Sequence, residues 1–270
     1  AEAGVQNITL VARNKVTLEN VRKDLSLKYP STKFHVQSLD VADYKAVQAA
    51  GKAMIKDGGP PTLLFNNAGI TAVYAFQDVP IEDFEKLMKC NYLGVVYMTK
   101  VLAPSMPPGS NIMMTSSMAG ALGVYGYTCY TPTKFAIRGF AESLQSEVRR
   151  DGISVSLSFP PDTDTPMFEA ENKTKPKETH MISDAAGLIK PEVVAKTMVK
   201  AALSPNPPFF VYFALEGWML NNLTAGMSPV HGFVDALTQV TLMGLFRLIS
   251  LFYLWDFTRI ISKCGKEKKA

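Results

Sequence analysis

The chain has 270 residues, which is enough for one large α/β domain with a sizeable core or for two small domains. Its formal net charge is only +4, and its lysines and arginines are dispersed apart from the last few, so the composition gives little support for nucleic-acid binding. The three cysteines, Cys90, Cys129 and Cys264, lack the spacing of a metal site or a disulfide framework. We therefore expect neither a metal nor a nucleic-acid partner.

Short apolar runs alternate with segments of helical periodicity along most of the chain. Strands are expected at residues 7–12, 33–39, 62–65, 110–115, 154–159 and 209–213. Helices are expected at residues 16–27, 43–56, 81–90, 93–102 and 191–202, and in a long amphipathic segment that ends near residue 151. This alternation predicts an α/β fold with a doubly wound, Rossmann-like parallel sheet that binds ligands at the carboxyl ends of its strands. Since no linker divides the chain, residues 1–215 are predicted to form one domain and residues 216–270 a C-terminal extension.

The stretch from Thr115 to Ala136 carries the residues that point to catalysis. Ser117 precedes Tyr130 by thirteen residues, and Lys134 follows Tyr130 by four, which is one helical turn. A fixed ammonium near a phenol stabilises the phenolate and lowers its pKa from about 10, so Tyr130 is expected to transfer a proton. The Ser117 hydroxyl would hold a carbonyl oxygen while a hydride reaches the carbonyl carbon.

A second Tyr-x-x-x-Lys pair, Tyr29 and Lys33, is a decoy. Pro30 drives Tyr29 out of helical geometry, and no serine lies thirteen residues before it. Tyr130, by contrast, is preceded by an apolar run and a Ser/Gly-rich loop, and Pro132 places it at the start of the helix that follows. Downstream, the polar, lysine-rich residues 168–187 are expected to form a mobile lid over this site.

Four separated motifs fall in one order and spacing: Asn66-Asn67-Ala68-Gly69, Asn91, Ser117 and the Tyr130/Lys134 pair. Over residues 5–215 this constellation resembles the short-chain dehydrogenase/reductase superfamily. The resemblance implies that Tyr130 donates the proton, that Ser117 holds the substrate oxygen, and that Lys134 binds the nicotinamide ribose and lowers the tyrosine pKa. It also implies that Asn91 supports a proton relay through water, although the sequence equally allows Asn91 to cap the helix after it.

The cofactor preference is predicted from charge at a strand end. In this fold an acidic residue after the second strand binds a ribose 2′-hydroxyl, whereas a nearby arginine suits a 2′-phosphate. The strand at residues 7–12 is followed by Arg13, which favours NADPH and a reduction, unless Arg13 is an ordinary surface arginine. The resemblance places Asp40 and Val41 at the adenine and Thr165 at the nicotinamide amide. It completes the cofactor site with Asn67, Ala68, Gly69, Tyr130, Lys134 and Pro160.

Longer matches indicate one branch of the superfamily. They are the run from Tyr130 to Gln145, the run Pro-Pro-Asp-Thr-Asp-Thr-Pro from Pro160 to Pro166, and Gly-Leu-Phe-Arg at residues 244–247. These runs resemble the reductases that convert 3-ketosphinganine to sphinganine with NADPH at the cytosolic face of the endoplasmic reticulum, which implies a long-chain lipid ketone as substrate. Two alternatives stay open: a membrane-bound reductase of a steroid or retinoid carbonyl, and an inactive scaffold that keeps the fold.

Residues 240–255 are apolar on nearly every helical face, and Arg247 is the main interruption. A straight span needs about 20 apolar residues, so we expect membrane association with either a spanning or an interfacial topology. A buried core helix or a dimer helix, and with the latter a homo-oligomer, is the alternative. The end, Lys266-Glu267-Lys268-Lys269-Ala270, resembles a dilysine retrieval signal and predicts an endoplasmic reticulum membrane location with the catalytic domain facing the cytosol.

The Thr-Gly-x-x-x-Gly-x-Gly loop that the superfamily carries after its first strand has no counterpart here, since only Gly4 precedes residue 7. The sequence thus predicts a Rossmann-like sheet that lacks its first, central strand. Two buried edges would be unpaired, and no helix N-terminus would hold the pyrophosphate. We expect the sequence to be incomplete at its N-terminus and the 270 residues alone to bind NADPH poorly.

Overall fold

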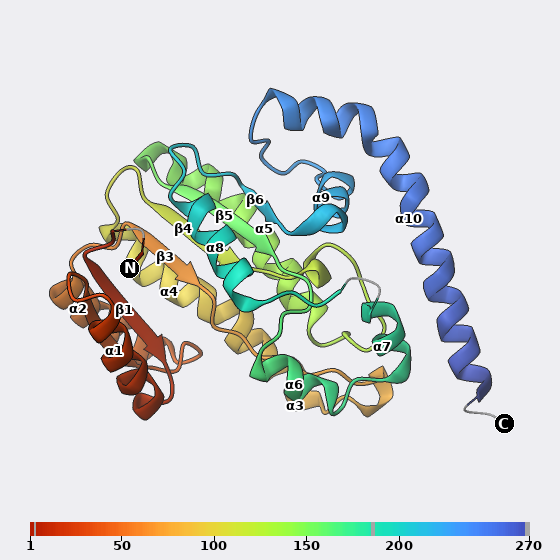
Figure 1. The fold of residues 1–270 in the computed structure, drawn as a ribbon, viewed down its shortest axis with the longest axis horizontal. Coiled ribbons are helices and arrows are strands. Elements are labelled where there is room, and N and C mark those ends of the chain that lie inside the picture. Colours follow the sequence, from red (N-terminus) through yellow and green to blue (C-terminus); the bar gives the residue numbers. More distant parts are fainter. Residues whose placement is uncertain (3, 185–186, 268–270) are drawn as a thin grey trace.

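The computed structural model of the chain describes residues 1–2, 4–184 and 187–267 (Figure 1). Its strands are β1 (Asn7–Ala12), β2 (Lys33–Ser38), β3 (Leu63–Asn66), β4 (Asn111–Thr115), β5 (Ser154–Phe159) and β6 (Phe210–Tyr212). Its α-helices are α1 (Lys15–Lys28), α2 (Tyr44–Gly58), α3 (Ile81–Leu87), α4 (Gly94–Leu102), α5 (Thr131–Val148), α6 (Pro166–Asn172), α7 (Lys177–Ser183), α8 (Pro191–Ala202), α9 (Ala214–Leu223) and α10 (Phe233–Glu267). Each strand lies within one residue of its expected bounds.

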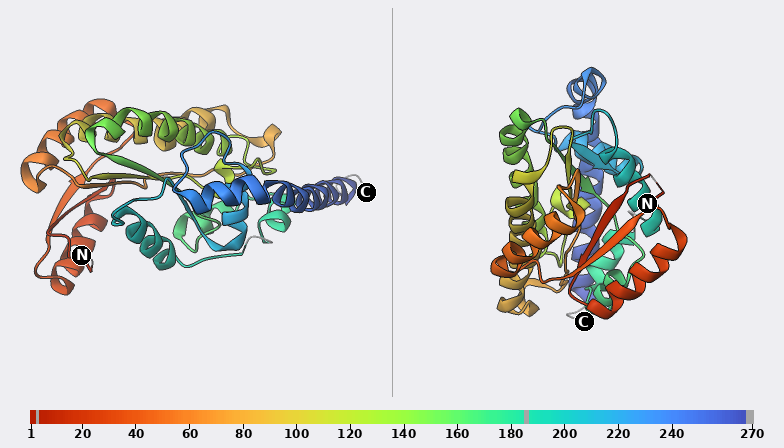
Figure 2. Two further views of the ribbon diagram at one scale, coloured as in Figure 1. Left: turned by 90° about the horizontal axis from the view of Figure 1, so that it is seen from above. Right: turned by 90° about the vertical axis from the view of Figure 1, so that its left-hand side faces the viewer.

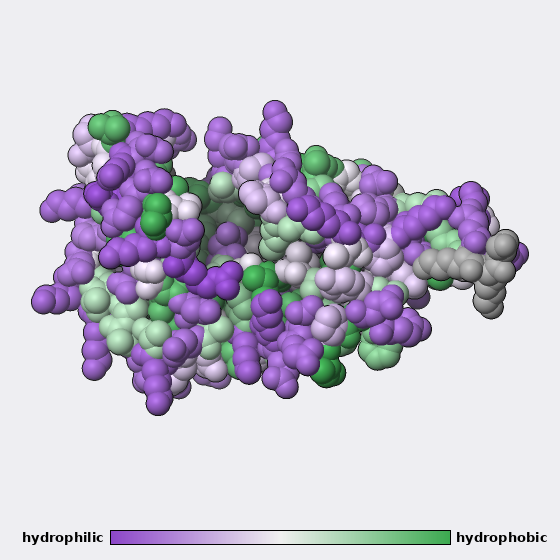
Figure 3. Space-filling view, turned by 90° about the horizontal axis from the view of Figure 1, so that it is seen from below, coloured by the Kyte–Doolittle hydropathy of each residue, from purple (hydrophilic) through white to green (hydrophobic). Residues whose placement is uncertain are grey.

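The strands form two parallel sheets, one of β1 and β2 and one of β3, β4, β5 and β6 in that order. The predicted parallel α/β fold is confirmed, and within the described residues β1 pairs only with β2 and β3 only with β4. The sequence predicts that the two unpaired edges are buried, but every β1 residue is exposed or half-buried. The surface is hollowed beside this N-terminal part (Figure 3). Water can therefore reach the unpaired edge of β1, whereas Leu64 and Asn66 of β3 are buried, as predicted for the other edge.

Helices cover both faces of the four-stranded sheet (Figure 2). Alternate side chains of β4 point to opposite faces, as the pleat of a strand requires. Ile112 and Met114 belong to the main core with residues of α2, α4 and α5, whereas Met113 packs against Met198 of α8. These three β4 side chains are completely buried. β4 is therefore the centre of the core, and the chain that leaves its carboxyl end is firmly placed.

The helices after β1 and β2 begin where a side chain caps them. Asn14 accepts a hydrogen bond from the amide of Thr17 at 3.0 Å, and Asp43 accepts one from the amide of Ala46 at 3.1 Å. Each cap satisfies an amide that has no partner within the first helical turn. The caps thereby hold the predicted cofactor residues that precede them at the two strand ends.

The helices predicted at residues 81–90 and 93–102 are continuous in the structure. α3 runs into a π-helical segment, Met88–Leu93, which continues as α4. Such i→i+5 hydrogen bonding is rare and is found frequently at functional sites. Here it places Asn91 inside the protein, where its side chain is completely buried.

The segment predicted as a lid consists mainly of α6 and α7, and its residues 185 and 186 lie outside the described part of the chain. Thr179 of α7 is completely buried and donates a hydrogen bond to the Tyr125 carbonyl at 2.7 Å. The segment borders the cavity described below. It does so as two packed helices rather than as an open loop, with Lys175, Thr179 and Ile182 among its buried residues.

The C-terminal part consists of α9 and the 35-residue α10. α10 packs on α9, where the rings of Trp218 and Phe246 meet edge to face 5.2 Å apart. It also packs on α7, where Ile182, Ile260 and Cys264 form a small cluster. The opposite side of α10 faces away from the protein (Figure 1). Among the described residues, α10 alone is long and apolar enough to cross a membrane, judged by length and composition. Only 6% of its 18-residue apolar window is buried, which excludes a buried core helix.

Close packing of α2 on α4 is expected to make Gly51 intolerant of a side chain. A Cβ at Gly51 would lie 2.2 Å from Cγ1 of Val101, whereas a Cβ at Gly139 of α5 would meet nothing within 4 Å. We expect Gly51→Ala to lower the free energy of unfolding by about 1 to 2 kcal/mol, because overpacking outweighs the helix propensity of alanine. Gly139→Ala should raise it by about 0.5 to 1 kcal/mol. Urea unfolding followed by circular dichroism checks both, and equal effects would contradict the packing argument.

Candidate active site

A cavity of about 820 Å³ opens at the carboxyl ends of β3, β4 and β5. One end is formed by residues that follow these strands, among them Asn67, Ser117 and Pro160. The other end is formed mainly by apolar side chains of α8, α9 and α10. Doubly wound sheets bind ligands at the carboxyl ends of their strands. The cavity therefore joins the predicted catalytic residues to an apolar compartment.

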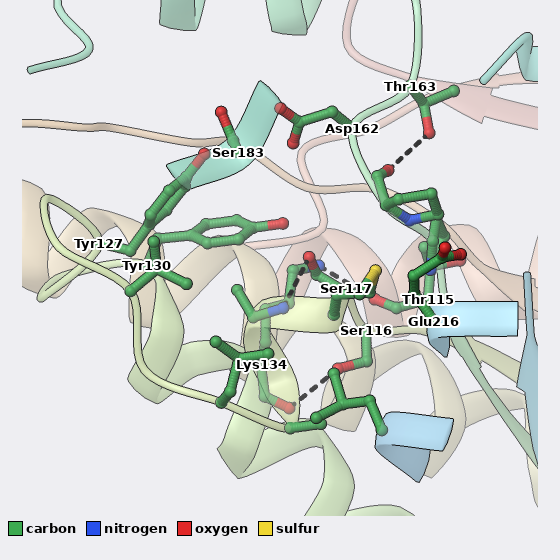
Figure 4. A pocket seen from close by; sticks show the side chains of 18 of the residues that line it. Thr115, Ser116, Ser117, Tyr127, Tyr130, Lys134, Asp162, Thr163, Ser183 and Glu216 are labelled. Carbon is green, nitrogen blue, oxygen red and sulfur yellow. Dashed lines mark hydrogen bonds between the residues drawn. The ribbon is translucent and has the colours of Figure 1, made fainter. Parts of the chain in front are cut away.

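Ser117, Tyr130 and Lys134 meet at the polar end of this cavity (Figure 4). Ser117 follows β4, and its hydroxyl oxygen accepts a hydrogen bond from the Ala119 amide at 3.2 Å. Tyr130 directly precedes α5, as predicted, and its hydroxyl points toward Ser117. Lys134, one turn into α5, donates a hydrogen bond to the Thr115 carbonyl oxygen at 3.0 Å. Its Nζ lies 5.4 Å from the centre of the Tyr130 ring, so the two side chains share one side of the helix.

Burial dominates the electrostatics of this group. Burial raises the pKa of the Tyr130 phenol above its usual value, Glu171 and Asp162 raise it further, and a hydrogen bond with Ser117 lowers it. The sequence predicts a lowered pKa, so the structure gives the opposite direction. Desolvation of a phenolate at this depth outweighs the attraction of an ammonium beside the ring. Burial likewise lowers the pKa of Lys134 to about 8.

Asn91 lies behind the catalytic group and not in the cavity wall. Its amide nitrogen donates hydrogen bonds to the Ile70 carbonyl at 2.9 Å and to Thr133 Oγ1 at 3.1 Å, and its oxygen accepts one from the Ile70 amide at 2.8 Å. Since Leu93 directly precedes α4 and Asn91 lies inside the π-helical segment, the helix-cap alternative is wrong. Asn91 instead ties the loop after β3 to α5. The water relay stays a prediction.

Four of the other predicted cofactor residues line the polar end of the cavity, namely Asn67, Gly69, Pro160 and Thr165. Asn67 Oδ1 accepts a hydrogen bond from Thr115 Oγ1 at 2.9 Å, which joins the ends of β3 and β4. Within the described residues Lys134 donates one hydrogen bond of the three that an ammonium can make. Its two remaining donors suit ribose hydroxyls, so this end fits the nicotinamide half of a dinucleotide chemically.

The remaining predicted cofactor residues lie outside the cavity wall, namely Arg13, Asp40, Val41 and Ala68. Arg13 and Asp40 are exposed at the carboxyl ends of β1 and β2. The charges of Arg13, Asp40 and Lys134 all act on the pKa of one group, the Cys90 thiol. Burial and Asp40 raise the pKa of this thiol, whereas Arg13 and Lys134 lower it. The strand ends of the small sheet and the catalytic lysine thus influence the pKa of the same thiol.

A buried charged group also borders the cavity, and no sequence motif predicts it. Lys175 Nζ lies 2.9 Å from Glu171 Oε1 and 3.3 Å from Asp162 Oδ2, and the Tyr127 hydroxyl donates a hydrogen bond to Glu171. The i,i+4 spacing of Glu171 and Lys175 is the available signal. In a lysine-rich segment, however, that spacing is typical of an ordinary surface pair.

Nor does the sequence place α10 against the site. α10 contributes to the cavity wall a stripe that includes Phe246, Ile249, Tyr253 and Phe257. These residues recur every three or four positions and so share one face of the helix. Because residues 240–255 are apolar on nearly all faces, periodicity cannot identify the face that turns inward.

Comparisons with known proteins agree with this geometry. Residues 1–176 match the family model of the short chain dehydrogenases. The chain is similar to the 3-dehydrosphinganine reductase of Danio rerio, with 44% identity over 97% of this chain and 80% of that protein. It is 42% identical to the 3-ketodihydrosphingosine reductase of Bos taurus, over 97% of this chain and 80% of that protein. The NADPH-bound structure of a short chain oxidoreductase from Pseudomonas aeruginosa has the same fold, with a TM-score of 0.69, 18% identity, and coverage of 77% of this chain and 85% of that one.

The buried ammonium of Lys134 is expected to make stability rise with pH. Its pKa is about 8 in the folded chain, against an ordinary value of 10.5. Between these values the unfolded chain binds a proton that the folded chain does not, so the free energy of unfolding rises with pH by up to about 3 kcal/mol. Below pH 8 both states are protonated, and the folded state bears the full cost of the buried charge.

We therefore expect Lys134→Met to stabilise the protein at neutral pH and to remove this rise. The measurement is the difference in unfolding free energy between wild type and variant from about pH 8 to pH 10.5. The titration of all other groups cancels in this difference. Lys100→Met, at an exposed position of α4, is the control and should leave the pH profile unchanged. If the unfolding free energies of wild type and Lys134→Met changed with pH in parallel, the lowered pKa of Lys134 would be contradicted.

Proposed function

Because the chain belongs to the short-chain dehydrogenase family, we propose that it reduces 3-ketosphinganine to sphinganine with NADPH, a step of sphingolipid synthesis. The observation that carries this proposal is the cavity with a proton donor for a carbonyl at one end and an apolar compartment at the other. A long-chain lipid ketone has the same division into a polar reactive head and an alkyl chain. The named activities of the Danio rerio and Bos taurus relatives agree with it.

In this mechanism the ketone oxygen lies between the hydroxyl groups of Ser117 and Tyr130. Ser117 donates a hydrogen bond that stabilises the negative charge developing on that oxygen, and Tyr130 transfers its proton to it. The phenol is protonated at neutral pH, as a proton donor must be, and its raised pKa makes it a weaker acid than a free phenol. Lys134, whose Nζ lies 5.4 Å from the centre of the Tyr130 ring, then stabilises the phenolate. NADPH, when bound, supplies the hydride that the carbonyl carbon accepts.

The assignment of NADPH rests on Arg13. Its exposed side chain lies at the carboxyl end of β1, and its backbone carbonyl is held by the Ser38 hydroxyl at 2.9 Å. A guanidinium in this place suits the 2′-phosphate that distinguishes NADPH from NADH. Asp40 and Val41, after β2, would contact the adenine. Lys134 would hold the nicotinamide ribose, with Asn67, Ala68, Gly69, Pro160 and Thr165 around it.

The apolar end of the cavity would hold the alkyl chain of the substrate. Met198 of α8, Leu220 and Leu223 of α9, and Phe246 and Phe257 of α10 line it. Each methylene moved from water into such a compartment contributes about 0.8 kcal/mol. The proposal therefore assigns α9 and α10 to substrate binding as well as to membrane association.

We assign the protein to the endoplasmic reticulum membrane, with its catalytic part in the cytosol. The outer side of α10 exposes large apolar and aromatic residues, including Val240, Phe252 and Trp255. Its inner stripe is engaged with the cavity and α7, so the outer side is the one free to enter lipid, which favours an interfacial position. Lys268 and Lys269 of the dilysine sequence lie outside the described residues.

The first test is substrate choice. The protein expressed from its full coding sequence should consume NADPH when 3-ketosphinganine is added, and this is followed by NADPH absorbance and by detection of sphinganine. A steroid ketone is the comparison substrate and should give little turnover. Equal or faster reduction of the steroid would favour the alternative substrate class. No turnover of either ketone would favour an inactive scaffold.

The second test removes the proton donor. Tyr130→Phe should lower kcat by about 10²-fold to 10⁴-fold, because the transferred proton is lost while the ring remains. The control is Tyr29→Phe in the decoy pair, whose hydroxyl donates to Glu2 at the surface, and it should leave kcat unchanged. Retention of kcat by a folded Tyr130→Phe variant would overturn the proposed mechanism.

The third test addresses the membrane. The double variant Phe252→Glu/Trp255→Glu should reduce binding to phosphatidylcholine vesicles at least about tenfold, because it places charges on the apolar outer side of α10. Val16→Glu/Leu27→Glu is the matched control, since Val16 and Leu27 of α1 are 71% and 84% exposed, against 66% and 65% for Phe252 and Trp255. Vesicle flotation measures the effect, and equal flotation of the two variants would contradict the assignment to α10.

A further inference from the structure

The charged group of Asp162, Glu171 and Lys175 lies in the wall of the cavity beside Tyr130. Asp162 and Glu171 both line the cavity, and both act on the Tyr130 phenol by raising its pKa. The ring of Tyr127, whose hydroxyl donates a hydrogen bond to Glu171, lies 5.6 Å from the ring of Tyr130, which places the Glu171 carboxylate beside the reacting phenol. Neither Asp162 nor Glu171 has a role in the proton transfer described above, so their presence at this position calls for a separate explanation.

The group contains more negative than positive charge. Two carboxylates share one ammonium, that of Lys175, whose side chain is 1% exposed. Burial raises the pKa of Asp162, whereas Lys175 lowers it. An uncompensated buried charge is costly, so a second cation in this part of the cavity would be favoured.

Glu171 has one oxygen available for such a cation. Its side chain is 9% exposed, so it is more than nine-tenths buried. Its Oε1 accepts the hydrogen bond from Tyr127 and forms the ion pair with Lys175. Its Oε2 receives no hydrogen bond from the residues that the structure describes. A carboxylate oxygen that is open to a cavity, on a side chain otherwise buried, is suited to a donor on a ligand.

We propose, building on the proposed function, that Glu171 and Asp162 bind the ammonium group that 3-ketosphinganine carries on the carbon next to its ketone. In an α-amino ketone the nitrogen lies about 3 Å from the carbonyl oxygen, as in the N–Cα–C=O unit of a peptide. A substrate whose oxygen meets Tyr130 and Ser117 thus brings its ammonium to the neighbouring wall. Tyr127 and Lys175 position the Glu171 carboxylate through Oε1.

This site would also assist the reaction. Asp162 and Glu171 oppose formation of the Tyr130 phenolate. A bound ammonium offsets their negative charge, so the phenol loses its proton more readily when an amino ketone is present than when a plain ketone is present. The enzyme would then select its substrate by the amine as well as by the alkyl chain.

The test compares two ketones of equal chain length, 3-ketosphinganine and a 3-ketone that lacks the amine. Wild type should have the higher kcat/KM for the amino ketone, and Glu171→Gln should reduce the ratio of the two kcat/KM values at least about tenfold. Asp162→Asn should shift the ratio in the same direction. Glu169→Gln, at an exposed position of α6 outside the cavity wall, is the matched control and should leave the ratio unchanged.

The outcomes separate this inference from the proposed function. If wild type reduces 3-ketosphinganine but Glu171→Gln and Asp162→Asn lose activity equally on both ketones, the residues are structural and the ammonium site is wrong. An unchanged ratio in both variants overturns it as well. If wild type does not reduce 3-ketosphinganine, the proposed function itself fails, and the ammonium site fails with it.

Discussion

A buried ammonium must be hydrogen-bonded, and this requirement fixes the geometry of the site. Lys134 meets it by donating to the carbonyl of Thr115, the last residue of β4. That bond attaches the first turn of α5 to the buried strand β4, so Ser117 and Tyr130, which lie at the two ends of the segment between β4 and α5, approach each other (Figure 4). Asn91 completes the arrangement from behind by holding the loop after β3 against α5. The reactive phenol is thus placed by the core and not by the loop that carries it.

The lining of the cavity changes from polar to charged to apolar along its length, and different parts of the chain supply each kind of lining. The end of β4 provides the Ser117 hydroxyl, and the start of α5 provides the Tyr130 phenol and the Lys134 ammonium. The loop after β5 provides the carboxylate of Asp162 and α6 provides that of Glu171, while α8, α9 and α10 provide most of the apolar wall. The short-chain dehydrogenase fold accounts for the first part alone. The other two parts are where a substrate with an amine and an alkyl chain would be distinguished from other ketones.

Much of the fold and the reacting group could be predicted because both depend on local spacing. Strand bounds follow from short apolar runs, and the positions of Ser117, Tyr130 and Lys134 follow from a helical turn and from the proline after the tyrosine. The tyrosine pKa could not be predicted in the same way, because its direction is set by burial and by Glu171, which lies 41 residues downstream in the sequence. Likewise, the inner face of α10 could not be identified, since the helix is apolar all round.

The two-sided packing of α10 has a consequence for how a lipid could travel. One face of this helix closes the cavity, and the other is available to a bilayer. A ketone that slid laterally past α10 would keep its alkyl tail in apolar surroundings throughout the transfer. Passage through water would instead expose the tail at about 0.8 kcal/mol for each methylene. The helix that is proposed to hold the protein at the membrane would then also be the route by which the substrate passes from the bilayer into the cavity.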